Sequence, residues 1–463
     1  DTPMRIGRLR LAPVSLAVAA TIFALAMSVG SRPAPAAGPP SDPDIEPGVI
    51  LVRFRPQVDL PRVAAELAAA GAVDDREIPA LRIRKMRVPA GREREIAARL
   101  AARPDVEFAV VSPVAYTHWV PNDALYGSQW ALPKIGAEQA WNVTKGSPTI
   151  TVAVLDTGFD VGHPDSPANL VLGTDYVLGG VVSGDPFGHG THVAGTIAAN
   201  TDNVTGVAGL APGVTLLSIR VLDMYGVGPY YNIALAIREA ANAGAKVVNL
   251  SLGGVYPDYT GELSLAVQYA LDRGVLVVAS AGNCGDLATY AAAGCPSLDA
   301  PMYPAAIPGV LAVAATTVDD TRASYSNSGS YVGIAAPGGD NPASGTQPSA
   351  ATRILSLYPV SMGTPSACYF PTAGYCTLRG TSMAAPHVSA LAGLILSRNS
   401  TLSPNQVVGI IRSTANPLGQ TVPNEQIGYG RIDAAAALAA VPPPMYFPLA
   451  ANAAAAPAAA GAP

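Results

Sequence analysis

Charged side chains are scarce in this chain of 463 residues, where Asp, Glu, Lys and Arg together make up 13%. The formal net charge is -5, and no stripe of Lys and Arg is interleaved with aromatic residues. Nucleic-acid binding requires such a basic surface, so we expect no nucleic-acid partner. Hydrophobic residues account for 49% of the sequence, which suffices for one large core with accessory segments.

Only four cysteines are present, and they lack the Cys-x-x-Cys and His spacings of zinc sites. Cys284 and Cys295 lie close in sequence, as do Cys368 and Cys376. This spacing favours two local disulfides in an oxidising compartment. The alternative is four unpaired buried thiols.

The first forty residues have the features of a targeting segment. Arg5, Arg8 and Arg10 precede an apolar run at 11–29, and small residues follow at 34–37. This order is typical of a secretory signal peptide. We therefore assign residues 1–40 to a signal peptide region and expect a secreted, extracellular protein. The apolar run is also long enough for an uncleaved membrane anchor, which is the alternative.

Residues 41–118 form a separate region that is rich in Arg. Strand-like segments at 49–54 and 81–88 are each followed by an Ala-rich helical pattern, which predicts a small α/β domain. A connector at 116–122, ending near Pro121, suits an exposed and cleavable boundary.

Residues 119–440 alternate between strands, loops and helices. Segments such as 231–243 and 263–272 predict helices. Between the helices lie apolar runs that read as buried parallel strands, at 150–155, 215–221, 246–250, 275–279 and 310–314. The expected fold class is α/β, with a doubly wound parallel sheet. Residues 441–463 are rich in Ala and Pro, too poor in large apolar residues to build a core, and predict a flexible tail.

Four segments of the larger region hold side chains suited to nucleophilic and acid–base chemistry. Asp156 ends a buried strand in the sequence VLDTG, at the edge where open α/β sheets bind ligands. His189 begins a helix in GHGTHVAGT, Asn283 follows a strand in ASAGN, and Ser382 begins a helix in GTSMAAPH. The amino terminus of a helix favours a developing negative charge at Ser382.

Each segment alone also has an ordinary structural explanation. Asp156 fits a turn or helix cap, Ser382 a helix cap, and Asn283 a loop. We assign His192 to packing or a local hydrogen bond. Pro386 is expected in the first turn of its helix, where its missing N–H has little effect.

Taken together, and in the order Asp, His, Ser, the four segments resemble the motifs of the subtilisin family, the subtilases, over residues 122–440. The resemblance implies that Asp156, His189 and Ser382 are a catalytic triad and that Asn283 stabilises an oxyanion. The expected activity is that of a serine endopeptidase acting on protein or peptide substrates through an acyl-enzyme. A monomer is expected.

Residues 41–118 resemble the inhibitory propeptide of the family, including VEFA at 106–109. This chain has VVSP at 110–113, where relatives usually carry Glu-Pro-Asn. The resemblance implies a self-processing zymogen whose own propeptide is an intramolecular inhibitor.

The resemblance also implies a substrate-binding set. Segments 226–228 and 251–254 match those that pair with an extended peptide, although ordinary Gly turns have the same spacing. Met302 aligns near the floor of an apolar pocket for the residue before the cut, and we expect it to shorten that pocket. The full set is Gly226, Gly228, Tyr230, Ser251, Leu252, Gly253, Gly254, Ala281, Gly282 and Met302.

Three oxygen-bearing residues match a calcium site of thermitase-like subtilases. They are Asp123, Asp165 and Asn203, and the alternative is that they are solvated surface residues. A structural Ca²⁺ would gain six or more oxygen ligands if the loop at 200–207 added the carbonyl groups of Asn200, Thr205 and Val207. No organic cofactor is expected.

Two other functions fit the sequence less well. An esterase of the α/β-hydrolase fold needs Gly-x-Ser-x-Gly and the order Ser, Asp, His, but Ala384 stands in place of the last Gly. An inactive subtilase used as a binding module would have lost at least one triad residue, and none is lost.

Overall fold

A computed structural model describes residues 45–56, 58–69, 71–114, 119–257, 261–286, 295–341, 351–363, 368–370 and 372–442. The expected signal peptide region, most of the connector and nearly all of the tail lie outside these residues. In the part of the chain that is described, no helix has the length and apolar character needed to span a membrane.

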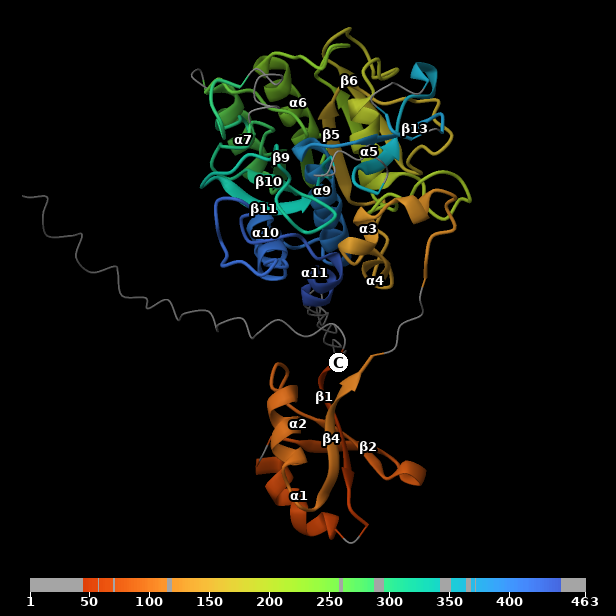
Figure 1. Cartoon of the computed structure of the whole chain (residues 1–463), viewed down its shortest axis with the longest axis vertical. Coiled ribbons are helices and arrows are strands. Elements are labelled where there is room, and N and C mark those ends of the chain that lie inside the picture. Colours follow the sequence, from red (N-terminus) through yellow and green to blue (C-terminus); the bar gives the residue numbers. More distant parts are fainter. Residues whose placement is uncertain are drawn as a thin grey trace, which may run out of the picture. The chain divides into compact units, whose positions relative to one another are not determined.

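The amino-terminal domain is a four-stranded antiparallel sheet with two helices on one face (Figure 1). Ile50, Val52 and Phe54 alternate along one strand and pack with the helices, so one face of the sheet forms the core. The second strand is polar and exposed along its whole length, so no hydrophobic pattern in the sequence predicts it. The elements are β1 (Ile45–Phe54), α1 (Leu60–Ala69), β2 (Val73–Ile78), β3 (Ile83–Arg87), α2 (Glu93–Ala101) and β4 (Val106–Pro113).

The larger domain contains a seven-stranded parallel sheet in the order β11-β10-β9-β8-β5-β7-β6. Five of its strands lie within about two residues of the apolar runs, and the expected fold class is confirmed. The two edge strands were not predicted. The strands are β5 (Thr151–Asp156), β6 (Leu170–Asp175), β7 (Thr215–Arg220), β8 (Val247–Leu250), β9 (Leu276–Ser280), β10 (Leu311–Thr316) and β11 (Val332–Pro337).

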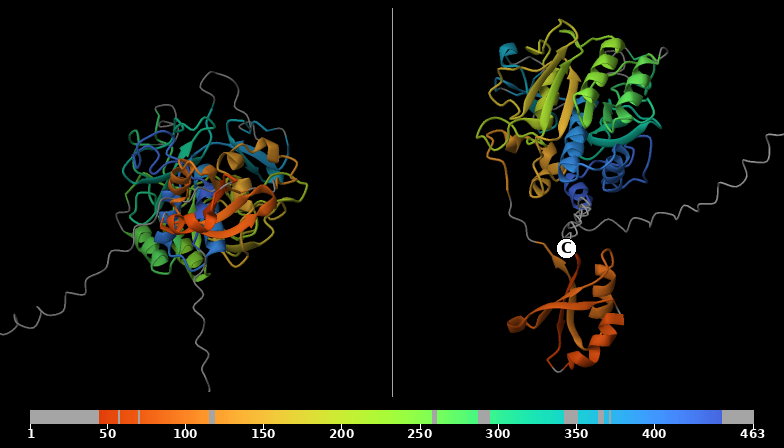
Figure 2. Two further views of the ribbon diagram at one scale, coloured as in Figure 1. Left: turned by 90° about the horizontal axis from the view of Figure 1, so that it is seen from below. Right: turned by 180° about the vertical axis from the view of Figure 1, so that it is seen from behind.

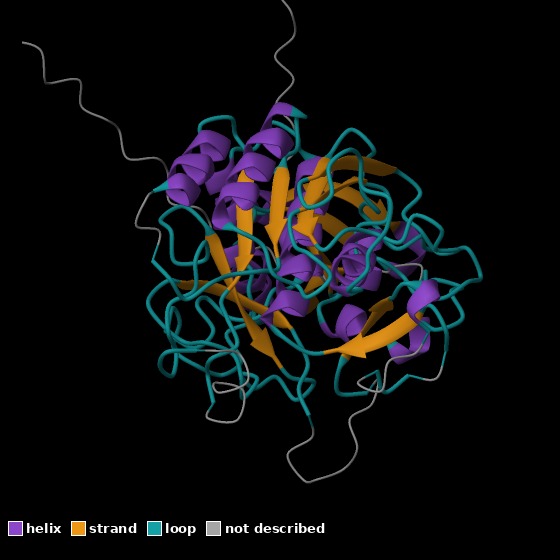
Figure 3. Cartoon of the chain, turned by 90° about the horizontal axis from the view of Figure 1, so that it is seen from above, coloured by secondary structure: helices purple, strands orange, loops and turns teal. Residues whose placement is uncertain are grey.

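Helices cover both faces of this sheet (Figures 2 and 3). Val152 and Val154 of β5 belong to one buried cluster and Ala153 and Leu155 to another, because successive strand residues face opposite sides. The first cluster includes α5 (His189–Ala198) and α9 (Thr381–Arg398). The second includes α6 (Tyr230–Asn242) and α7 (Glu262–Leu271).

The remaining elements surround this core. They are α3 (Ala131–Lys134), α4 (Ala137–Trp141), α10 (Pro404–Ser413), α11 (Ala434–Ala440) and an antiparallel hairpin of β12 (Ile354–Leu357) and β13 (Tyr375–Leu378). His192 of α5 joins both hairpin strands, since its Nε2 lies 3.0 Å from the Ile354 carbonyl oxygen and 3.1 Å from that of Cys376. Burial lowers the pKa of His192 to about 3, so the neutral ring donates this hydrogen bond. This matches the structural role expected for His192.

Helix α5 packs on the hairpin through Gly195. A Cβ at this position would lie 2.5 Å from the Leu357 Cγ and the Ser356 Oγ. Gly195→Ala should therefore lower the free energy of unfolding by about 1–3 kcal/mol through overpacking. Gly409→Ala in α10, where a Cβ meets nothing within 4 Å, should raise it by about 0.5–1 kcal/mol. Denaturant unfolding in a Ser382→Ala background measures both, and equal effects would contradict the close packing.

Candidate active site

A cleft of about 650 Å³ lies at the carboxyl ends of the parallel strands. Its walls come from the segments that follow β5, β7, β8 and β9 and from the amino termini of α5 and α9. Among the described residues that line it, none is Asp, Glu, Lys or Arg. This edge is where open α/β sheets bind their ligands.

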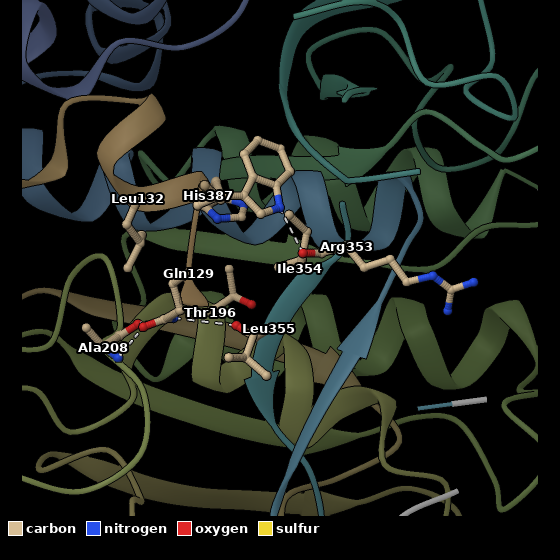
Figure 4. A pocket seen from close by; sticks show the side chains of 10 residues that line it. Gln129, Leu132, Thr196, Ala208, Arg353, Ile354, Leu355 and His387 are labelled. Atoms are coloured by element: carbon tan, nitrogen blue, oxygen red, sulfur yellow. Dashed lines mark hydrogen bonds between the residues drawn. The ribbon is translucent and has the colours of Figure 1, made fainter. Parts of the chain in front are cut away.

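A second cavity, of about 10 Å³, lies against β12 (Figure 4). The Gln129 side chain lies between Ala208 and Leu355, and its Nε2 donates a hydrogen bond to the Ala208 carbonyl at 2.9 Å. A space of this size holds at most about one water molecule. The cleft is therefore the candidate active site.

His189 lines the cleft and contacts Asp156. Asp156 ends β5, His189 begins α5, and His189 Nδ1 lies 2.8 Å from Asp156 Oδ1. Burial lowers the pKa of His189, but the charge of Asp156 and this hydrogen bond more than offset it, so the pKa is raised above its ordinary value. The close approach needs Gly190, where a Cβ would lie 2.3 Å from the Gly158 carbonyl oxygen.

Asp185 fixes the start of α5, which begins after Gly188 and so has no capping side chain of its own. Asp185 accepts hydrogen bonds from the Gly188 N–H and the Thr191 N–H, each at 2.8 Å. Thr157 Oγ1 donates to Asp185 at 2.8 Å and accepts from the Gly190 N–H at 2.9 Å. The residue after Asp156 is thus bonded to the first turn of the helix that carries His189. Sequence reasoning missed Asp185 and Thr157, although an acid just before a helix start is a capping signal.

Ser382 lies in the first turn of α9 and faces the same cleft. Its hydroxyl donates to the Ser251 carbonyl at 3.1 Å, and no hydrogen bond joins it to His189 within the described residues. Ser251 Oγ in turn donates to the Ser382 carbonyl at 2.8 Å and accepts from Asn249 Nδ2 at 2.9 Å. Buried side chains at the end of β8 thereby hold Ser382 in place.

The expectation for Pro386 was wrong, because it lies in the interior of α9 and not in its first turn. Proline has no N–H to donate to the carbonyl four residues earlier, which is that of Ser382. The hydrogen bond from Ser251 Oγ satisfies this freed carbonyl. The interior proline is therefore compatible with the helix, and it leaves the Ser382 carbonyl available for the hydrogen bond from Ser251.

Asn283 follows β9 and lines the cleft beside Ser382. Its Oδ1 accepts two hydrogen bonds from Thr381, from the backbone N–H at 3.0 Å and from Oγ1 at 2.9 Å. Two donors at Oδ1 select one orientation of the amide. The Nδ2 group is left as a donor for the cleft.

Most of the expected substrate-binding residues line the cleft, namely Gly226, Gly228, Tyr230, Ser251, Leu252, Gly253, Gly254, Gly282 and Met302. Ala281 does not, because adjacent residues of an extended segment face opposite sides. Its side chain packs in a buried cluster with Ala314 and Val332, and its carbonyl accepts from the Tyr331 hydroxyl at 2.8 Å. The main chain of Gly254 pairs with Tyr303 through two hydrogen bonds of 2.9 Å, so it is already occupied.

Other residues line the cleft that no motif in the sequence identified, although several lie next to the motifs. They are Thr157, Phe187, Leu222, Tyr225, Val227, Pro229, Ile233, Tyr256, Ser280, Cys284, Cys295 and Thr381.

The structure forms both expected disulfides, Cys284–Cys295 and Cys368–Cys376, with Cα–Cα distances of 5.9 and 5.2 Å. The first of them belongs to the cleft wall.

The residues expected to bind calcium also come together. Asp165 Oδ1 accepts from Asn203 Nδ2 at 2.8 Å, and its Oδ2 accepts from the Val207 N–H at 3.0 Å. Asp123 reaches the same loop, since its Oδ2 accepts from the Asp202 N–H at 2.8 Å. Both carboxylates are buried.

The electrostatics of this cluster suit a cation. Burial raises the pKa of Asp165 to about 7, with the charge of Asp123 adding to the effect, and burial also raises the pKa of Asp123. Asp123 Oδ1 is buried and has no hydrogen-bond partner among the described residues. Asn200 donates its N–H to the Asp165 carbonyl at 3.3 Å, and Thr205 donates its N–H to Asn203 Oδ1 at 2.8 Å. No three His, Cys, Asp or Glu side chains of the described chain form a metal cluster, so amide and carbonyl oxygens would have to complete the site.

Comparison with known proteins agrees with this geometry. A family model described as the subtilase family matches residues 147–430, and one described as the fervidolysin N-terminal prodomain matches residues 31–112. The chain belongs to the subtilase family. This subtilase is a serine endopeptidase, with a prodomain of antiparallel strands before its catalytic domain.

Its relatives cover much of its length. It is 35% identical over 389 residues to the thermophilic serine proteinase of Bacillus sp. strain AK1, covering 83% of this chain and 86% of that protein. It is 38% identical over 304 residues to thermitase of Thermoactinomyces vulgaris, covering 65% and 94%. The crystal structure of a lanthipeptide protease superposes with a TM-score of 0.60 at 31% identity, covering 70% of this chain and 99% of that one.

The charge of Asp185 also raises the pKa of His189, which gives a prediction for Asp185→Asn. A negative charge stabilises the imidazolium, so its removal should lower the pKa of His189. The imidazole signal in a pH titration by NMR measures this directly. His192 and His387 have pKa values of about 3 and about 4, so both stay neutral at the pH values where His189 titrates. Asp272→Asn, an exposed acid of α7's carboxyl end, is the control. An unchanged His189 titration in Asp185→Asn would contradict the prediction.

Proposed function

We propose that this subtilase is secreted as a zymogen and cleaves peptide bonds of protein or peptide substrates through Asp156, His189 and Ser382. The observation that carries the proposal is the 2.8 Å hydrogen bond between His189 Nδ1 and Asp156 Oδ1 in a cleft that also contains Ser382 and Asn283. Together these four residues can supply the base, the group that orients it, the nucleophile and an oxyanion donor that the hydrolysis needs.

In the first step, the Ser382 hydroxyl leaves the Ser251 carbonyl by rotation about its Cα–Cβ bond and turns to His189 Nε2. Nε2 accepts the proton while Oγ attacks the carbonyl carbon of the substrate. Asp156 holds the Nδ1–H tautomer and stabilises the imidazolium. Asn283 Nδ2 and the Ser382 N–H donate to the oxyanion of the tetrahedral intermediate.

The intermediate then collapses. The C–N bond breaks, the leaving amine takes the proton from His189 Nε2, and the acyl group remains as an ester on Ser382 Oγ. Water attacks this ester and gives a proton to His189, which returns it to Oγ as the acid product leaves. Each step therefore uses the same imidazole, first as base and then as acid.

An extended substrate fits the free main-chain groups of the cleft. The Gly226 carbonyl, the Gly228 N–H and both main-chain groups of Gly253 have no hydrogen-bond partner within the described residues. Pairing of an extended peptide with such edges supplies affinity without selecting side chains. This supports substrate binding by segments 226–228 and 251–253.

We assign residues 1–40 to a signal peptide region, 41–118 to an inhibitory propeptide, 119–440 to the catalytic domain of a monomer, and 441–463 to a tail. The prodomain match at 31–112 and the subtilase match at 147–430 support the inner boundary. Trp119 supports it as well, since its ring contacts Trp141 edge-on at 5.3 Å and lies 3.2 Å from Lys145 Nζ. Two disulfides suit an extracellular protein.

Self-processing is tested by Ser382→Ala, which should accumulate as a precursor because the propeptide junction is cut by the same active site. Mass spectrometry of the purified protein locates the amino terminus. Ser147→Ala, which changes a half-buried serine outside the cleft lining, should mature normally, hydrolyse casein and be blocked by a serine-directed phosphonate. Maturation of purified Ser382→Ala at the junction, with no added protease, would refute self-processing.

The pocket for the residue before the cut contains Met302. A Cβ on Gly282 would lie 2.3 Å from Met302 Cγ, and one on Gly253 would lie 3.4 Å from Met302 Cε. The Met302 side chain therefore touches both walls and occupies space between them. With no charged residue in the described lining, the pocket suits medium-sized apolar side chains.

Met302→Gly should lengthen this pocket. The ratio of kcat/KM for Phe or Tyr to that for Leu or Met before the cut should rise by about tenfold or more, as expected when a side chain that fills part of an apolar pocket is removed. A peptide library that varies only this residue measures the ratio. An unchanged preference would remove Met302 from the pocket.

We also propose that the cluster of Asp123, Asp165 and Asn203 binds a structural Ca²⁺. The unpaired and buried Asp123 Oδ1, together with a second buried carboxylate, supports this assignment. The ion would neutralise the two acids and take further oxygens from the loop at 200–207. It would join the first residues of the catalytic domain to the segment after α5.

Chelation should then destabilise the protein. A ligand present at 100 times its Kd stabilises the native state by about 2.7 kcal/mol, so excess EGTA should lower the melting temperature of the Ser382→Ala protein by several degrees. Asp165→Ala should mimic chelation and abolish any further effect of EGTA, while Asp272→Asn should behave as the parent. The same melting curve with EGTA, on protein verified as metal-free, would refute the calcium site.

A further inference from the structure

The turn before His189 is held by a residue that is distant in sequence. Tyr358 directly follows β12 and is 7% exposed. Its hydroxyl donates to the Phe187 carbonyl at 3.2 Å. Its ring lies against Gly188, since a Cβ on that glycine would be 2.4 Å from one ring carbon and 2.5 Å from another. Tyr358 therefore contacts both of the residues that immediately precede His189.

The peptide unit between Phe187 and Gly188 is held at both of its polar ends. Its N–H, on Gly188, donates to Asp185 Oδ1 at 2.8 Å, and its carbonyl, on Phe187, accepts from Tyr358. Burial raises the pKa of Tyr358 and the charge of Asp185 raises it further, so the hydroxyl keeps its proton and acts as a donor. Rotation of this peptide unit would break both hydrogen bonds.

Gly188 is the point at which the turn could deform. It has a φ of 91°, and without a Cβ its backbone could adopt many other conformations. The Tyr358 ring fills the place that a side chain at this position would take. Because His189 is the next residue, a change in the backbone of Gly188 would move the imidazole relative to Asp156.

The hairpin of β12 and β13 keeps Tyr358 in this place. The Tyr358 N–H donates to the Gly374 carbonyl at 2.7 Å, and the side chain packs in a buried cluster with the Cys368–Cys376 disulfide. These contacts fix the side chain independently of the turn that it supports. Tyr358 is absent from the described lining of the cleft, so its effect on the chemistry would pass through His189.

We propose that Tyr358 is a positioning residue, which holds the turn before His189 so that the imidazole stays in hydrogen-bond contact with Asp156. The inference rests on the proposed peptide hydrolysis, in which this hydrogen bond orients the base. Asp185 fixes the N–H groups of the turn, whereas Tyr358 fixes a carbonyl and occupies the space beside Gly188. Loss of Tyr358 should therefore impair the chemical step and not the binding of substrate.

Peptide kinetics of the mature enzyme provide the first test, with kcat expressed per active site titrated by a serine-directed phosphonate. Tyr358→Ala should lower kcat by about tenfold or more, because a displacement of about 1 Å can cost about a hundredfold in rate. KM should change by about twofold or less. Tyr358→Leu keeps apolar volume beside the disulfide but has no ring or hydroxyl, so it should show the same loss even if Tyr358→Ala does not fold. Tyr358→Phe keeps the ring and loses one hydrogen bond, and its kcat should stay within about threefold of the parent.

The position of the imidazole is read by NMR in the full-length Ser382→Ala protein, which lacks the nucleophile. The signal of the His189 Nδ1 proton, which is shared with Asp156, should move upfield in Tyr358→Ala and Tyr358→Leu, because the hydrogen bond lengthens. Tyr269→Ala truncates a half-buried tyrosine of α7 outside the cleft lining and is the matched control. It should leave both kcat and the proton signal unchanged.

The outcomes separate this proposal from the proposed hydrolysis. An unchanged kcat in the Ala and Leu variants of Tyr358, or an unchanged Nδ1 proton signal, overturns the role of Tyr358 while the hydrolysis stands. A raised KM with the parent kcat also overturns it, since Tyr358 would then act on substrate binding. If the parent enzyme turns over no peptide but the proton signal still depends on Tyr358, the hydrolysis is refuted and the positioning of His189 is supported. Absence of turnover together with a signal that ignores Tyr358 refutes both.

Discussion

The geometry of the cleft depends on how the first turn of α5 is held against the end of β5. A helix start leaves backbone N–H groups without partners, and here Asp185 and Thr157 supply the acceptors. Because Thr157 follows Asp156 directly, the same contacts that cap the helix set the distance between the carboxylate and His189. A change in the cap would displace the imidazole as well as destabilise the helix.

The positions of Ser382 and Asn283 depend on similar hydrogen bonds at the start of α9. Pro386 frees the carbonyl of Ser382, and Ser251 donates to it, so the residue that follows β8 and the helix share one pair of reciprocal hydrogen bonds. Asn283 is fixed by Thr381, the residue before Ser382. Hydrogen bonds between the segments that carry these residues, and not the sheet alone, therefore position the groups that would act on a carbonyl.

Much of this arrangement could be predicted from the sequence. The apolar runs of the central strands identify the parallel sheet, because strands buried on both faces have continuous hydrophobic patterns. The edge strands β6 and β11 were missed, since Gly173 and Gly333 interrupt the pattern. Motifs located Asp156, His189, Asn283 and Ser382, whereas the contributions of Asp185 and Thr157 depend on contacts between segments that are distant in sequence. The orientation of Ala281 and the pairing of Gly254 with Tyr303 likewise required the three-dimensional structure.

The described lining of the cleft has no Asp, Glu, Lys or Arg, and this has a consequence for association kinetics. Fixed charges in a cleft attract oppositely charged ligands over distances of a Debye length, and dissolved salt weakens that attraction. The lining itself supplies no such attraction, so the selection of a peptide at this surface comes from shape and from main-chain hydrogen bonds and not from steering by charge.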